Sequence, residues 1–186
     1  ARTAGFGVHD KKDSTGICFI GERRFSTFLA EYINKSPGEI RSHDDEVIGQ
    51  HDGLMFYTIG QRQGLGIGGR RNASGEPWYV TGKELDRNIL RVAQGVNHPS
   101  LFSSGLQAGS LHWISGVAPG DEFSCRARIR HQQPLQDCNV TVTGQQSCRV
   151  DFREPQRAIT PGQSVVFYMG DECLGGAVID HPVTEA

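Results

Sequence analysis

The spacing of apolar residues divides the chain into one helical stretch and a longer stretch with strand spacing. In residues 22–33, apolar side chains recur at intervals of three and four residues, at Phe25, Phe28, Leu29, Tyr32 and Ile33. This spacing predicts one amphipathic α-helix. The helix is expected to end before the Pro37-Gly38 pair, because the residue before a proline is biased away from helical geometry.

Residues 38–95 are predicted to form a small glycine-rich unit. The apolar run 53–60 fits either a short helix or a buried strand, and its periodicity does not decide between them. Two strand patterns follow at 78–81 and 89–92, on either side of the turn-forming residues 85–88. This arrangement predicts a β-hairpin.

From residue 97 onward the pattern is that of an all-β domain. Short apolar or alternating segments, separated by turns rich in Gly and Pro, cover residues 123–130, 138–143, 147–152, 164–169 and 173–179. Several short strands at this spacing favour a small antiparallel β-barrel. The predicted fold class is therefore mainly β with one clear α-helix, with a small central α+β or β domain before a C-terminal barrel.

The strand predicted at 123–130 alternates strictly between apolar and polar residues. Its polar face carries Arg126, Arg128 and Arg130, and His131 follows directly. Three guanidinium groups on one face repel each other unless acids or anions lie opposite. Cross-strand pairing with Asp151 or Glu154 and binding of RNA phosphates explain this pattern about equally well.

Composition and charge exclude some functional classes. The formal net charge of −2 gives no overall basic field, so any contact with RNA must come from a local patch. The chain contains no run of the roughly 20 apolar residues that a membrane-spanning helix needs. It starts without Met or a signal-peptide pattern, and we expect a fragment of a longer protein. Five cysteines without C-x-x-C spacing favour a reducing cytoplasm over a disulfide framework, and no metal site is expected.

Cys18 lies in the segment KKDSTGICFIG, directly before the predicted helix. A free cysteine is most often a core residue, as expected here for Cys125, Cys138, Cys148 and Cys173. Cys18 differs because a polar approach precedes it, and Lys11 and Lys12 would stabilise a thiolate if they fold nearby. Its residue context therefore leaves both a core role and a reactive role open.

The segment 64–69 reads G-x-G-x-x-G, which resembles a dinucleotide-binding loop by letter. Such a loop needs a strand before it and a helix after it, and Arg70-Arg71-Asn72 does not favour a helix start. A dinucleotide-dependent enzyme is thus disfavoured, and a flexible basic loop is the better interpretation.

Several segments, taken in order, resemble the bacterial family of tRNA-specific 2-thiouridylases over nearly the whole chain. The matching segments are DSTGICFIG (13–21), PG (37–38), GLM (53–55), YTIGQR (57–62), GLGIGG (64–69), PWYV (77–80), RIRHQQ (128–133), PQRAITPGQS (155–164) and CLGG (173–176). In this family sulfur is placed on carbon 2 of the wobble uridine, after ATP has adenylated the uracil oxygen.

The resemblance assigns roles to individual residues. It implies that Cys18 carries the persulfide, and that Arg130, His131 and Gln163 contact tRNA, with Arg126 and Arg128 as further candidates. The family more often has Tyr at the position of His131. It also implies a second cysteine and an ATP loop upstream, so no cofactor-binding residue is expected within this chain. A disulfide with Cys18 would form as sulfur leaves.

The resemblance further implies a division of the chain and a set of partners. Residues 1–35 would end the adenylating domain, 36–96 would form the central domain, and 97–186 would form the tRNA-contacting barrel. The expected cofactor is ATP with Mg²⁺, and the expected partners are tRNAs for Lys, Glu and Gln and a sulfur-relay protein or cysteine desulfurase. We expect this fragment alone to be inactive and the enzyme to be cytoplasmic. The alternative is a non-catalytic RNA-binding barrel with structural cysteines.

Overall fold

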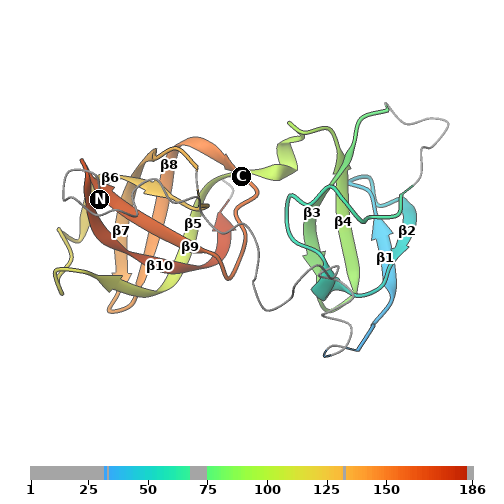
Figure 1. Cartoon of the computed structure of the whole chain (residues 1–186), viewed down its shortest axis with the longest axis horizontal. Helices are drawn as coiled ribbons and strands as arrows, with labels where there is room; N and C mark the ends of the chain where they lie inside the picture. Colours follow the sequence, from blue (N-terminus) through green and yellow to red (C-terminus); the bar gives the residue numbers. More distant parts are fainter. Residues whose placement is uncertain (1–31, 33, 68–74, 132, 184–186) are drawn as a thin grey trace, which may run out of the picture. The chain divides into compact units, whose positions relative to one another are not determined.

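The computed structural model describes residue 32 and residues 34–67, 75–131 and 133–183 (Figure 1). The chain divides into two compact units, residues 1–36 and 37–186, and the elements below all belong to the second. The predicted helix at 22–33 and Cys18 lie outside the described residues, apart from Tyr32.

The first half of the second unit is a four-stranded mixed sheet. Its strands are β1 (Gly38–Arg41), β2 (Val47–His51), β3 (Trp78–Glu84) and β4 (Ile89–Gln94), in the spatial order β2-β1-β4-β3. β1 and β4 run parallel, whereas β1 with β2 and β3 with β4 are antiparallel. The predicted hairpin at 78–92 is confirmed as β3 and β4. The run at 53–60 contains a short 3-10 helix, η1 (Leu54–Phe56), rather than a strand.

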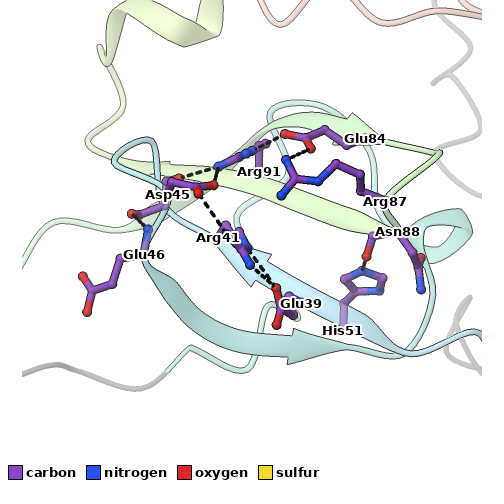
Figure 2. A network of polar contacts seen from close by, with 10 residues as sticks. Glu39, Arg41, Asp45, Glu46, His51, Glu84, Arg87, Asn88 and Arg91 are labelled. Atoms are coloured by element: carbon purple, nitrogen blue, oxygen red, sulfur yellow. Dashed lines mark hydrogen bonds and ion pairs between the residues drawn. The ribbon is translucent and has the colours of Figure 1, made fainter.

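One face of this sheet covers a small apolar core. Its fully buried side chains include Ile40, Val80, Leu90 and Val92, and Leu54 of η1 packs with them. Alternation along the strands puts polar residues on the outer positions, where they form the network in Figure 2. There the Arg91 guanidinium pairs with both Asp45 and Glu84, and Arg41 pairs with Glu39 and Asp45.

The second half of the unit is a closed six-stranded barrel in the order β10-β5-β8-β7-β6-β9, with every neighbouring pair antiparallel. The short helix η2 (Pro99–Leu101) leads into it. The strands are β5 (Phe102–Trp113), β6 (Glu122–Arg128), β7 (Gln136–Gly144), β8 (Ser147–Arg157), β9 (Ser164–Met169) and β10 (Glu172–Val183). The barrel confirms the predicted mainly-β class.

Inward-facing residues of all six strands fill the barrel interior. Phe167 is fully buried, and Trp113 packs against it and against Phe123 with ring centroids 5.6 and 5.7 Å apart. Cys138 and Cys148 are buried in the same core, as predicted, whereas Cys125 and Cys173 are only partly buried. Closure leaves no open edge among these strands, so every strand is paired on both sides.

One predicted boundary differs from the structure. The alternating pattern predicts a strand through Arg130, but β6 ends at Arg128. The Ile129 amide donates to the Gln133 side chain instead of to a neighbouring strand (3.2 Å), and this contact begins a turn. Arg130 therefore lies on a turn, apart from the strand face that carries Arg126. The proposed division at residues 35/36 and 96/97 stays a prediction.

Candidate functional site

Three loops line an open surface cavity of about 430 Å³. One loop follows η1, the second follows β6, and the third joins β8 to β9. The cavity is lined by Thr58, Ile59, Gly60, Gln61, Arg130, His131, Thr160 and Gln163. The three residues that the family resemblance predicts to contact tRNA thus line one cavity, although they are up to 33 positions apart in the sequence (163 − 130).

The first loop is fixed to strand β3 by its own backbone. The Gly60 amide donates to the Val80 carbonyl oxygen (2.7 Å), and the Val80 amide donates to the Gln61 carbonyl oxygen (2.9 Å). The Gln61 side chain also accepts from the Thr58 amide (2.9 Å). Gly60 has φ of 80°, a conformation that costs little only for glycine. These bonds hold the wall of the cavity in one position.

A pair of glutamines supports the turn after β6. The Gln133 amide closes the turn on the Arg130 carbonyl oxygen (3.2 Å), and its side-chain nitrogen donates to the Gln156 side chain (2.9 Å). Gln156 is buried, so its amide has to be satisfied within the protein. This contact fixes the turn that presents Arg130 and His131, and His131 itself is exposed.

The third loop begins at Ala158, which has a positive φ of 53°. Its amide donates to the Leu101 carbonyl oxygen (2.6 Å), and its own carbonyl oxygen accepts from Arg130 Nη2 and from the Thr160 hydroxyl, both at 3.0 Å. Gln163 is held at the far end of the loop, where its carbonyl oxygen accepts from the Ile179 amide (2.8 Å). Ala158 thus joins Arg130 to the loop that carries Gln163.

Two guanidinium groups converge beside Gly60. Arg130 Nη2 and Arg157 Nη1 each lie 3.6 Å from the position that a Cβ on Gly60 would occupy. Within the described residues, neither group contacts a carboxylate. Arg157 stacks on the Tyr79 ring (4.9 Å), donates from Nε to the Val96 carbonyl oxygen (3.1 Å), and has a buried Nη2 without a partner. Burial and the charge of Arg157 lower the pKa of Arg130. The site therefore carries uncompensated positive charge.

The other two arginines of the predicted face do not line this cavity. Arg126 Nη2 donates to the Gly170 carbonyl oxygen (2.9 Å), and Arg128 Nε is buried without a partner. Asp151, one of the acids considered opposite them, pairs instead with Arg149 through both carboxylate oxygens. Across the described part of the chain, no acid forms an ion pair with the arginines at 126, 128 and 130, although Asp137 is the register partner of Arg126.

Sequence reasoning missed several residues of the site. Thr58, Gln61 and Thr160 line the cavity, and Arg157 adds a second charge beside it. The segment PQRAITPGQ contains Arg157 and Thr160, but the strand predicted at 147–152 stops short of both, and the family resemblance assigned neither a role. The described residues contain no group of three His, Cys, Asp or Glu side chains that could hold a metal ion. None of the helices in the described part is long and apolar enough to cross a membrane.

Comparisons with known proteins agree with this arrangement. Residues 26–94 match the tRNA methyl transferase PRC-barrel domain, and residues 103–179 match the aminomethyltransferase beta-barrel domain. Proteins named tRNA-specific 2-thiouridylase MnmA are similar over almost the whole chain. The one from Marinobacter nauticus is 56% identical over 97% of this chain and 46% of its own length. The one from Idiomarina loihiensis is 51% identical over 100% of this chain and 50% of its own length.

The chain spans about half the length of the relatives it matches. The two matched domains follow the same order as the sheet and the barrel. More than half of the aligned positions are identical to these relatives, and both findings indicate the same family. The chain belongs to the tRNA-specific 2-thiouridylase family.

Proposed function

We propose that this chain is the tRNA-contacting part of a tRNA 2-thiouridylase, and that the cavity beside Gly60 binds the tRNA. The observation that carries this proposal is the grouping of Arg130, His131 and Gln163 on one cavity with uncompensated positive charge. The names of the relatives point to tRNA as the substrate.

The chemistry of the cavity suits a nucleic-acid backbone with an exposed nucleotide. A phosphate between Arg130 and Arg157 would neutralise two like charges that repel each other in its absence. His131 is exposed at the rim and has a flat ring on which a base or sugar can pack. The Gln163 amide offers hydrogen bonds to base edges or to 2′-hydroxyl groups, and the Thr160 hydroxyl, which donates to Ala158, can still accept one.

Sulfur transfer is assigned to Cys18, which lies outside the described residues. In the proposed step, the outer sulfur of a Cys18 persulfide attacks carbon 2 of the activated wobble uridine and AMP leaves. A second cysteine, upstream of this chain, then attacks the inner sulfur, which breaks the bond between the two sulfurs, releases the 2-thiouridine and leaves a disulfide between the second cysteine and Cys18. The cavity would hold the tRNA while this chemistry takes place on another segment of the enzyme.

The remaining parts of the proposal concern groups outside the described residues. ATP with Mg²⁺ would supply the activation of the uracil oxygen, through the loop that the family resemblance places upstream of this chain. A sulfur-relay protein or cysteine desulfurase would load Cys18, the tRNAs would be those for Lys, Glu and Gln, and the compartment would be the cytoplasm. The fragment alone would bind tRNA without thiolating it.

The test measures binding of a tRNA transcript to the chain over a range of salt concentrations. Arg130→Gln should weaken binding about 10-fold or more. It should also reduce the slope of the logarithm of the binding constant against the logarithm of the salt concentration by about one, because one phosphate contact is lost. The matched control is Arg153→Gln, because the Arg153 side chain is 78% exposed and lies 3.8 Å from Asp137. Equal effects of the two substitutions would contradict the assignment of the cavity and leave only general electrostatic binding.

The alternative is a non-catalytic RNA-binding module, which the same cavity would also serve. The two functions separate at Cys18, since only the enzyme needs this thiol. Thiolation by the full-length enzyme therefore decides between them, whereas binding alone does not.

A further inference from the structure

Two cysteines face each other on neighbouring strands of the barrel. Cys125 of β6 and Cys138 of β7 are register partners, and their Sγ atoms lie 3.7 Å apart. Directly opposed residues of antiparallel strands have Cα separations of about 4.5–5.5 Å, which falls within the range that a disulfide spans. The two sulfur atoms therefore need a small movement of the side chains, and no change of strand register, to form a bond.

The pair lies at a cavity separate from the proposed RNA site. This cavity has a volume of about 550 Å³ and its wall includes both cysteines, Arg126, Asn139 and Tyr168. Cys125 is partly buried, whereas Cys138 is buried. Of the two thiols, Cys125 is therefore the more accessible to a reagent.

The two thiols differ in their tendency to ionise. The contact with Cys138 Sγ and a backbone hydrogen bond from Tyr168 lower the pKa of Cys125. The same contact and burial raise the pKa of Cys138, whose Sγ also donates to the Cys125 carbonyl oxygen (3.6 Å). Because Cys125 is also the less buried of the two thiols, it is the expected nucleophile, and Cys138 is the thiol that follows.

We propose that Cys125 and Cys138 form a redox-active dithiol, which small disulfides such as oxidised glutathione convert into a cross-strand disulfide. The Cys125 thiolate attacks one sulfur of the glutathione disulfide and releases the first glutathione thiolate. Cys138 then gives up its proton and attacks the Cys125 sulfur, releasing the second. The two cysteines lose two electrons and two protons, and oxidised glutathione becomes two molecules of reduced glutathione.

The bond closes the loop between two residues that are 13 positions apart. This loop contains the turn with Arg130 and His131, so oxidation links the turn covalently at both ends. On the chain-entropy account, closing a loop of about 15 residues lowers the unfolding equilibrium constant by about two orders of magnitude. An effect on RNA binding rests on the proposed function, whereas the disulfide itself does not.

The experiment treats the folded chain with oxidised glutathione, blocks remaining thiols, and maps the peptides by mass spectrometry. After digestion with trypsin, we expect peptide 92–126, which contains Cys125, to be linked to peptide 131–149. Fragment ions must then place the bond at Cys138, because that peptide also contains Cys148. Burial raises the pKa of Cys148 to about 11, which makes it an internal control that should stay reduced. Hydrogen exchange of residues 126–137 should slow after oxidation and recover with dithiothreitol.

Other results contradict the proposal. In the Cys138→Ser variant the second step is impossible, so glutathione should remain attached to Cys125, whereas the wild-type chain should not accumulate this adduct. A stable glutathione adduct on the wild-type chain would overturn the proposal. The proposal would also be overturned if both thiols stayed free in the folded chain and formed a disulfide only after unfolding. The proposed function and the disulfide are tested by different measurements. Absence of RNA binding would contradict the proposed function, whereas the disulfide is judged from the mass spectra alone.

Discussion

Substitution of Gly60 by alanine tests how the RNA cavity is held together. Gly60 has φ of 80°, and a Cβ added there would lie 2.7 Å from the Cβ of Ala158. The left-handed conformation costs an alanine about 1–2 kcal/mol. Overpacking against Ala158 adds about 1–3 kcal/mol, and the reduced freedom of the unfolded chain returns about 0.4–1 kcal/mol. The free energy of unfolding should therefore fall by about 1–5 kcal/mol.

Three further variants separate the contact from the backbone strain. Gly64 has a similar φ of 77°, and its nearest neighbour for a Cβ is a side-chain atom at 3.9 Å, so Gly64→Ala reports the strain alone. Ala158→Gly removes the methyl group that Gly60→Ala would meet, and its positive φ of 53° suits glycine. The double variant Gly60→Ala/Ala158→Gly should recover most of the overpacking cost.

The assay is urea unfolding of all four variants, with binding of a tRNA transcript measured in parallel. Gly60→Ala should lose both stability and tRNA affinity, because Arg130 and the first loop meet at this contact. A coupling free energy of about 1–3 kcal/mol between the two sites is expected. Equal stability of Gly60→Ala and Gly64→Ala, with no coupling to Ala158, would refute the packing argument.

Two further predictions concern the mixed sheet. Gly38→Ala should destabilise the chain far more than Gly82→Ala in urea unfolding. A Cβ at position 38 would overlap the Asn88 carbonyl oxygen, whereas a Cβ at position 82 would make only an ordinary contact at 3.6 Å. Equal unfolding midpoints of the two variants would contradict this. The hydrogen bond from Arg91 lowers the pKa of Asp45 in the folded chain. The contribution of this pair to the free energy of unfolding is therefore fully present above the ordinary Asp pKa of 3.8, and it is lost as pH falls through the lowered pKa of the folded chain. Arg91→Met should reduce this acid dependence in unfolding curves at several pH values, and unchanged curves would argue against the pairing.

Local sequence patterns predicted most of the barrel because they report periodicity directly. The segments 138–143, 147–152 and 164–169 alternate or form apolar runs between turns, and each lies within an observed strand. The hairpin of β3 and β4 was predictable from its turn, where Asn88 takes a positive φ of 52°. The end of β6 was not predictable, because a side-chain bond from Gln133 replaces the strand ladder at Ile129.

The candidate site was predictable only in part. The family resemblance identified Arg130, His131 and Gln163 residue by residue, while periodicity placed Arg130 on a face with Arg126 and Arg128. The contributions of Gln61 and Arg157 depend on the packing of loops that are distant in sequence. No local pattern reports such packing, just as none reports that Cys125 and Cys138 are register partners.

The most direct test of the central claim measures 2-thiouridine formation by the full-length enzyme with ATP and a persulfide donor. Cys18→Ser should abolish the product while tRNA affinity stays unchanged, because the thiol carries sulfur and the cavity binds tRNA. Arg130→Gln should instead raise the tRNA concentration needed for half-maximal rate. Cys173→Ser, which changes a partly buried barrel thiol, should leave both quantities near wild type. Full thiolation by Cys18→Ser would contradict the account and leave the chain as an RNA-binding module.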